Sequence, residues 1–240
     1  MVRPYRYVRA CAWSGLILLA ATVLFWGVLG RNIPPISPAL DAEAFAAELR
    51  RHAPTIRIGM ILQLPFSVLY LVWGVAISKV MERVEEDNNV LSTLQIWGAG
   101  FTTVVFVVPC AMWLTLAYRP EVMDPRTLQI LYDFAWFFFD MAYSLTTLQT
   151  IAIGICFLSD KRPQPLVPAW VAWLTMWVGI SFVLETMMPL VTDGPFARNG
   201  LLNYWVEFSL FFLMMLVLSI YILKAITRLE LEHRETGARA

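Results

Sequence analysis

Long apolar stretches alternate with short polar connections along the chain, and this pattern predicts the fold. A helix needs roughly 20 mainly apolar residues to cross a bilayer. Six stretches qualify, at about residues 10–30, 57–78, 92–117, 128–158, 166–190 and 201–223. The sequence therefore predicts an all-α integral membrane protein, in which six transmembrane helices form a bundle. Residues 1–240 are expected to form a single membrane domain with a polar tail at 224–240.

The connection between the first two stretches, residues 31–56, has its own pattern. It starts with a Pro-rich piece, after which Ser37 is placed to cap a helix that has Pro38 at its first position. Arg50 and Arg51 then fall in the last turn, where the helix dipole favours cations. We expect a short amphipathic surface helix that caps the bundle between helices 1 and 2. A surface linker is the simpler interpretation, and a lid over a cavity is the alternative.

The positions of Lys and Arg predict the orientation of the bundle. With the N-terminus inside, eleven of these residues lie on the inner side and seven on the outer side, which accounts for all eighteen. The inner set includes Arg3 and Arg239. Because cytoplasmic loops are enriched in Lys and Arg, both ends of the chain are expected in the cytoplasm. The size and the six-helix pattern resemble those of bacterial inner-membrane proteins, so we expect that membrane as the location.

Composition supports the membrane assignment and narrows the chemistry. Hydrophobic residues make up 59% and charged residues 15% of the chain, against about 45–50% and about 25% in soluble domains. The net charge is zero, whereas a nucleic-acid partner needs a basic face, so none is expected. The two histidines, His52 and His233, lie in polar segments, and the three cysteines are far apart. We therefore predict no cofactor and no metal, because metal and haem sites in bundles rely on histidine or clustered cysteine.

Two aspartates interrupt the apolar segment 131–150, and their spacing predicts a shared helix face. Asp133 and Asp140 are seven residues apart, which is about 700° of rotation and about 10 Å along a helix. In a continuous helix the same sector holds Trp136, Phe137, Tyr143, Ser144 and Thr147. Carboxylates near the centre of a membrane helix cost about 2.5–3.5 kcal/mol and by default mark a functional site. We therefore expect this stripe to face the inside of the bundle.

Two further acids lie on other transmembrane stretches at a similar depth. Glu185 and Glu207 are each one to two turns from the outer end of their helix. We predict that Asp140, Glu185 and Glu207 are the catalytic groups of an acidic, aromatic-lined cavity in the outer half of the bilayer. The predicted ligand contacts are Asp133, Trp136, Tyr143, Ser144, Gln63, Tyr70 and Asn203.

The same polar residues also have structural interpretations. Acids near a helix end can reach the interface or pair with arginine, and for Asp133 the expected partners are Arg57 and Arg126. Buried amides and hydroxyls can serve as hydrogen bonds between helices. Asp140 has no cation at its depth along the sequence, so it is the acid that the pattern most clearly assigns to function.

The sequence leaves three functions open. Burial disfavours the charged form of a carboxyl group, so these acids can carry a proton at neutral pH. In the first hypothesis the cavity binds a small lipophilic molecule, such as an isoprenoid, steroid or lipid, and the acids isomerise or cyclise it. In the second, the acids belong to a small proton-coupled or cation transporter. In the third, they pair with basic residues of a partner helix, which makes the protein a non-catalytic membrane subunit. The expected partners are membrane lipid and the small ligand.

Overall fold

The structure is a computed structural model that describes residues 5–86 and 88–237. The described chain is helical and contains no strand. Four of its helical segments have 3₁₀ or π geometry in place of α geometry. In chain order the elements are α1 (Arg6–Ala21), η1 (Thr22–Leu29), α2 (Ala42–Ser67), α3 (Leu69–Met81), α4 (Val90–Tyr118), η2 (Pro120–Val122), α5 (Pro125–Met141), α6 (Tyr143–Leu158), α7 (Ala169–Ser181), η3 (Phe182–Leu190), η4 (Leu201–Val206) and α8 (Glu207–Gly237).

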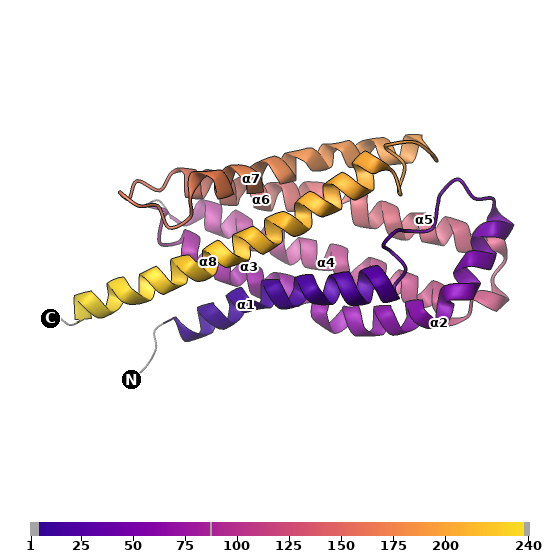
Figure 1. Cartoon of the computed structure of the whole chain (residues 1–240), viewed down its shortest axis with the longest axis horizontal. Helices are drawn as coiled ribbons and strands as arrows, with labels where there is room; N and C mark the ends of the chain where they lie inside the picture. The colour runs from indigo at the N-terminus through magenta and orange to yellow at the C-terminus, as the bar shows by residue number, and fades with distance from the viewer. Residues whose placement is uncertain (1–4, 87, 238–240) are drawn as a thin grey trace.

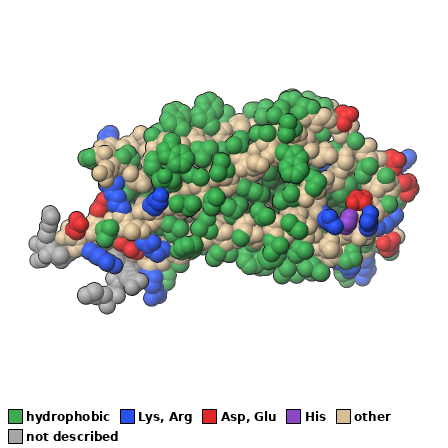
Figure 2. Space-filling view, viewed as in Figure 1, with side chains coloured by type: hydrophobic (Ala, Val, Ile, Leu, Met, Phe, Trp, Pro, Cys, Tyr) green, Lys and Arg blue, Asp and Glu red, His purple; other side chains and the backbone are tan. Residues whose placement is uncertain are grey.

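The described elements join into six helices that are long and apolar enough to cross a membrane. These spans are Arg6–Leu29, Ala42–Met81, Val90–Tyr118, Pro125–Leu158, Ala169–Leu190 and Leu201–Thr236. They lie lengthwise against one another in an elongated bundle (Figure 1). Hydrophobic side chains cover the middle of the visible face, whereas charged side chains gather at the two ends (Figure 2). The prediction of a six-helix integral membrane protein is confirmed.

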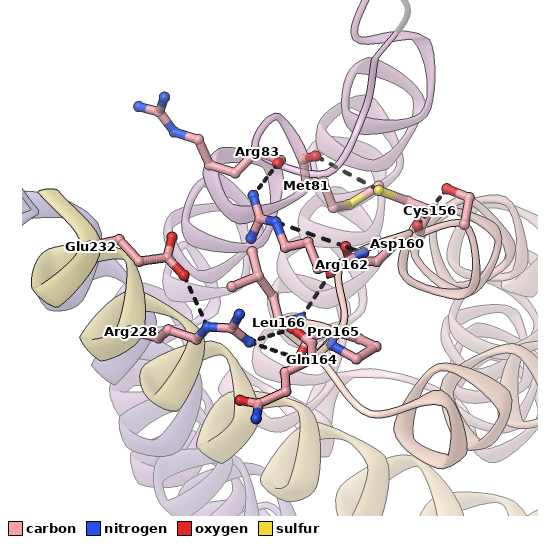
Figure 3. Close-up of polar contacts among 11 residues, drawn as sticks. Met81, Arg83, Cys156, Asp160, Arg162, Gln164, Pro165, Leu166, Arg228 and Glu232 are labelled. Atoms are coloured by element: carbon pink, nitrogen blue, oxygen red, sulfur yellow. Dashed lines mark hydrogen bonds and ion pairs between the residues drawn. The ribbon is translucent and has the colours of Figure 1, made fainter. Parts of the chain in front are cut away.

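One end of the bundle, here called the C-terminal end, is where α8 terminates. Arg9 near the start of α1 pairs with Glu230 of α8 at 2.9 Å, so the first and last helices meet there. The loop after α6 is fixed by Asp160, whose carboxylate accepts hydrogen bonds from the backbone N–H groups of Arg162 and Leu166. Figure 3 shows how the side chains around this loop connect it to its neighbours. The predicted inner residues Arg3 and Arg239 lie outside the described residues.

Two arginines join the C-terminal end across different helices (Figure 3). Arg162 donates to the backbone oxygen of Arg83, which follows α3, at 2.6 Å. Arg228 on α8 donates to the backbone oxygen of Gln164 and pairs with Glu232 one turn further along at 3.0 Å. These contacts hold α3, α8 and the α6–α7 loop together at this end.

The opposite end, here called the capped end, is covered by the first turns of α2. The sequence placed a separate short helix here with Ser37 as its cap, and that start is wrong. Asp41 is the cap, since its carboxylate accepts from the backbone N–H of Ala44 at 2.8 Å, and α2 continues without a break to Ser67. In Figure 1 these first turns cross the end of the bundle before α2 runs along it, and Pro54 lies within the helix. The capping role expected of this segment is retained.

The capping turns of α2 are fastened to the loop between α4 and α5. Arg50 donates to the backbone oxygens of Pro120 and Met123 at 3.1 and 2.9 Å. Asp124 caps α5, and the hydroxyl and N–H of Thr127 both donate to its carboxylate, which holds its pKa below the usual range. The capped end is therefore ordered by carbonyl and carboxylate contacts that bring α2, the α4–α5 loop and α5 together.

Two groups of buried apolar residues fill the interior. The group toward the C-terminal end includes Tyr70, Trp73 and Met214, and the group toward the capped end includes Trp26 and Trp113. The buried acids lie between these two groups, because residues from both groups line the cavity described below. The fold thus places a polar site between two groups of buried apolar residues.

Reporters fused to the two ends of the chain are expected to report the same side of the membrane, because α1 begins and α8 ends at one end of the bundle. Green fluorescent protein and alkaline phosphatase, which are active on opposite sides of a bacterial inner membrane, provide the measurement. A reporter inserted at Gly194, in the exposed loop before η4, is expected on the other side. Opposite sides for the two ends would contradict the six-span fold.

Candidate functional site

Each of the three buried acids lies at or beside a departure from regular α-helix geometry. Asp140 lies two residues before Ala142, which separates α5 from α6. Glu185 is in the 3₁₀ segment η3, and Glu207 begins α8 directly after the π segment η4. Mid-helix 3₁₀ and π geometry is frequent at functional sites and hinges. One face of η3 contributes to the cavity and η4 directly precedes Glu207, while other residues of these segments, such as Val183 and Leu201, are exposed.

The three acids meet at one cavity between the two apolar groups. Asp140, Glu185 and Glu207 all line it, and their residues are 2%, 7% and 1% exposed. They come from three different spans. The cavity volume is about 50 Å³. That volume suits a few water-sized groups or one small ion or molecule, and it is well below the roughly 300 Å³ of a drug-sized ligand site.

The carboxyl groups influence one another and have few partners. Charge on Glu207 acts on Asp140, and Glu185 is affected by both. Among the described residues, one oxygen of Asp140 is buried without a hydrogen-bond partner, while the carboxyl groups of Glu185 and Glu207 lie close enough to share a hydrogen bond. The cavity lining contains no Lys or Arg among the described residues. Nor is any set of three or more His, Cys, Asp or Glu side chains within those residues arranged around a metal position. This is an acidic site that lacks a built-in counter-charge in its wall.

Aromatic rings form most of the remaining wall. Trp26 is stacked on Phe139 and Phe208, with ring centroids 5.5 and 5.4 Å away. Phe139 and Phe208 are also parallel to each other, 6.1 Å apart. The other lining rings are Phe106, Tyr143, Phe182, Phe211 and Phe212. Aromatic faces carry partial negative charge and attract cations. Carboxyl groups and ring faces therefore create a negative potential in the same small space.

Hydroxyl groups supply the neutral polar part of the lining. Thr102 on α4 and Thr146 on α6 share a hydrogen bond of 3.0 Å at the cavity. Tyr143 shares one of 2.9 Å with Thr186. Thr22 accepts a hydrogen bond from Gln63 at 3.3 Å. These groups can orient water or a ligand without adding charge.

A buried arginine closes the capped end above the cavity. Arg198, in the loop before η4, donates to Asp133 and to the backbone oxygen of Ile36, the latter at 3.0 Å. Its guanidinium lies 4.9 Å from the ring centroid of Tyr132. Its charge also acts on Asp140, although it does not line the cavity. Arg198 thus joins α5 to two loops that are distant in sequence.

The structure corrects the predicted partner of Asp133. The sequence pointed to Arg57 and Arg126, whereas Arg198 forms the ion pair. The loop that holds Arg198 folds back over the bundle end, while Arg126 is exposed. Asp133 is consequently not part of the cavity wall.

The predicted ligand contacts fall into three groups. Tyr143 lines the cavity. Trp136, Gln63, Tyr70 and Asn203 are buried directly behind it and contact lining residues: Trp136 packs on Phe139 and Phe208, Gln63 bonds Thr22, Tyr70 packs on Phe106, and Asn203 lies beside Asp140.

Ser144 forms the third group, because its side chain is exposed and does not reach the cavity. The predicted stripe assumed one continuous helix over residues 131–150, and the break at Ala142 changes the register. After the break Thr146 faces inward where Ser144 was expected, and before it Phe137 is exposed. The stripe prediction is correct for Asp140 and wrong for these two positions.

Several lining residues were missed by sequence reasoning. Trp26 lies in a fully apolar stretch, so hydropathy alone gave no signal for it. Thr102 and Thr146 lie in stretches that contain several threonines, and the sequence did not distinguish them from Thr103 and Thr147. A test for irregular helix geometry is what would have found Trp26, since it lies in the π segment η1.

Comparison with protein-family models assigns the chain. The model of a domain of unknown function, DUF4386, matches residues 13–225. The chain belongs to the DUF4386 family. The matched region of this DUF4386 protein contains every residue that lines the cavity, so the site lies within the family domain. Comparisons with curated proteins and with solved structures found no match.

Replacing Arg198 by methionine is expected to destabilise the DUF4386 protein, because Asp133 and the Ile36 carbonyl lose their donor. Removing one member of a buried pair costs about 3–5 kcal/mol. Since the Asp133 side chain is 35% exposed, we expect about 1–3 kcal/mol after discounting for solvent. The measurement is the free energy of unfolding in detergent.

A double-mutant cycle provides the control for this prediction. The double variant Asp133→Leu/Arg198→Met is expected to lose less stability than the sum of the single variants, with a coupling of about 0.5–3 kcal/mol. Arg126→Met serves as the exposed arginine control, with a change within about 0.5 kcal/mol. Strict additivity of the two single variants would show that the pair contributes nothing specific.

Proposed function

We propose that the protein binds a small organic cation at Asp140, Glu185 and Glu207 and exchanges it for protons across the membrane. The observation that supports this most directly is the meeting of three buried carboxyl groups in one cavity whose described wall contains no Lys or Arg. Negative charge buried in this way requires compensation, either by protons on the carboxyl groups or by a bound cation.

The exchange follows from charge balance. Each carboxylate held at membrane depth costs about 2.5–3.5 kcal/mol on insertion scales. Protons remove that charge when the site is empty, and an amine or ammonium ion balances it when the site is occupied. A cation that enters therefore releases protons, and a proton that returns weakens the hold on the cation. This competition couples the movement of the two species.

Ring faces and cavity size define the class of cation. Trp26, Phe139 and Phe208 line the cavity, and aromatic rings attract ammonium groups. The volume of about 50 Å³ favours an ion with few heavy atoms, such as a methylated ammonium. A metal ion is a poorer candidate, because the described His, Cys, Asp and Glu side chains do not surround a common point.

The irregular segments provide the means of opening the site on alternate sides. η1, η3 and η4 each contribute to the cavity wall or directly precede a residue that does. Segments of this geometry change conformation at lower cost than regular helix, and hinge motion at a central site is the basis of alternating access. By contrast, α4 spans 29 residues as one helix and can act as the fixed side.

We place this activity in a bacterial inner membrane with the C-terminal end of the bundle in the cytoplasm. Of the described residues, nine Lys and Arg lie at that end and seven at the capped end, which is the bias expected for a cytoplasmic face. The reporter fusions described above test this orientation, since periplasmic activity at both chain ends would reverse it.

Binding of simple ammonium ions tests the proposal. Purified protein is expected to bind methylammonium or tetramethylammonium in calorimetric titrations, with an affinity that rises with pH because protons compete for the same carboxylates. Asp140→Asn and Glu207→Gln are each expected to weaken binding at least about tenfold, equivalent to about 1.4 kcal/mol. The same variants are expected to lose uptake of the ion into proteoliposomes driven by a proton gradient.

Two controls make this test specific. Asp193→Asn changes an exposed acid in the loop before η4 and is expected to leave binding and uptake unchanged. The neutral molecule tert-butanol has a shape similar to tetramethylammonium and is expected not to compete. Equal affinity of wild type and both cavity variants would rule out the site, and equal binding of the neutral molecule would rule out the role of charge.

A lipophilic ligand is the second candidate, and the eight aromatic side chains of the wall favour it. In that function one acid protonates an isoprenoid, steroid or lipid and another removes a proton, while ring faces stabilise the cationic intermediate. A ligand of that size requires the cavity to expand several-fold from about 50 Å³. The third hypothesis is that the acids pair with a partner helix. Their burial inside the bundle does not support it.

Mass spectrometry of molecules that co-purify with the protein separates the two candidates. If the lipophilic function is correct, the wild type is expected to retain a specific lipid that Asp140→Asn loses. Equal lipid content in the two proteins would contradict this placement of the ligand and leave the cation proposal as the better account.

A further inference from the structure

A line of buried polar residues continues from the cavity toward the C-terminal end. On α4, Thr102, Gln95 and Ser92 follow one another on the same face, seven and three residues apart, and all are buried. Thr102 is itself part of the cavity wall. From Thr102 to Ser92 the helix rises about 15 Å. This is about half of the 30 Å hydrocarbon core of a bilayer.

Neighbouring helices add polar groups along this line. Thr146 on α6 bonds Thr102 at the cavity. One turn further, Gln149 accepts a hydrogen bond of 2.9 Å from Tyr70 on α3. Near the end of the line, Ser78 on α3 donates to the backbone oxygen of Ser92 at 3.0 Å. The polar groups therefore lie at the interfaces between α3, α4 and α6, in the interior of the bundle.

The middle of the line contains amide atoms that have no hydrogen-bond partner among the described residues. Gln95 is fully buried, and neither its oxygen nor its nitrogen has a hydrogen-bond partner. The side-chain nitrogen of Gln149, also fully buried, is unpaired as well. Buried amide groups left unpaired cost about 1–3 kcal/mol each, and ordered water is the usual partner of such groups. The helices pack closely here because glycine has no side chain. Gly98 lies against Gln149, and Gly74 lies near the amide of Gln95.

The line ends at an acidic side chain that contacts solvent. Both oxygens of Glu85 accept backbone hydrogen bonds at the start of α4, from Leu91 at 2.7 Å and from Ser92 at 2.9 Å. Glu85 is partly exposed in the loop at the C-terminal end. Its negative charge raises the local concentration of protons where the line opens.

We propose that this line is a proton path between the C-terminal end of the bundle and the cavity acids. The inference rests on the proposed function, because it assigns the route by which protons reach Asp140, Glu185 and Glu207. Water hydrogen-bonded to Gln95, Gln149 and Thr102 passes a proton along the line. The proton ends on a cavity carboxylate, which becomes a neutral carboxylic acid, and the net step is one proton taken from water at the C-terminal end.

The test compares proton flux with cation binding in the same variants. Gln95→Leu and Thr102→Val replace polar groups of the line by apolar groups of similar size. Each is expected to reduce proton flux into proteoliposomes, measured with an internal pH-sensitive dye under a potassium diffusion potential, by about tenfold or more. The affinity of Gln95→Leu for tetramethylammonium is expected to stay within about twofold, because Gln95 does not line the cavity.

Thr103→Val is the matched control for Thr102→Val. Thr103 is the adjacent residue and is also buried, but its hydroxyl bonds Ala99 of its own helix. Proton flux is expected to be unchanged in this variant. Neither Gln95 nor Gln149 lines the cavity, so retained tetramethylammonium binding confirms that Gln95→Leu and Gln149→Leu are folded. If Gln95→Leu does not fold, Gln149→Leu carries the test.

The outcomes separate this inference from the proposed function. Wild-type flux in Gln95→Leu and Gln149→Leu, together with normal cation binding, would overturn the path and leave the cation site intact. Failure of the wild type to bind any ammonium ion would overturn the proposed function. If proton flux then still depends on Gln95 and not on Thr103, the result would support a proton path that serves another reaction.

Discussion

Charge that is buried in the membrane is the constraint on which the structure depends. Asp140, Glu185 and Glu207 are almost fully buried, and a membrane interior offers neither water nor counterions to compensate them. The fold responds by placing all three in one cavity between two apolar groups of residues. Because the acids share a space, one ligand or a few protons can neutralise them together. If the three carboxyl groups lay on separate helix faces, each would have to be neutralised separately.

The burial of the cavity acids had a strong local signal in the sequence, whereas positions that depend on backbone geometry had none. A carboxylate inside an apolar stretch is visible in the sequence, so the three cavity acids were found before the structure. Ser144 was placed wrongly because the break at Ala142 is not encoded by a proline or glycine that pattern reading detects. The sequence pattern placed the cap at Ser37, whereas the bond from the backbone N–H of Ala44 to the Asp41 carboxylate places it four residues later.

Contacts between residues that are distant in sequence were the second feature that the sequence could not predict. The pairing of Asp133 with Arg198 depends on how a loop folds over the bundle end, and the sequence offered nearer arginines. The same applies to the α3–α4–α6 interface, where Gln95, Gln149 and Tyr70 come together from three helices. Helix count and apolar faces follow from periodicity alone. Which polar groups meet follows from packing, and packing is a property of the assembled bundle.

The ion pair between Asp133 and Arg198 has a consequence for biosynthesis. The two residues are 65 positions apart, so at a synthesis rate of about 5–20 residues per second the ribosome adds Arg198 roughly 3–13 s after Asp133. During that interval the fourth span contains an aspartate whose partner has not yet been made. The insertion machinery or the lipid headgroup region has to accommodate it until the last loop arrives. Completion of the capped end is therefore tied to the late stages of translation, and a chain truncated before this loop lacks the cation that secures its fourth helix.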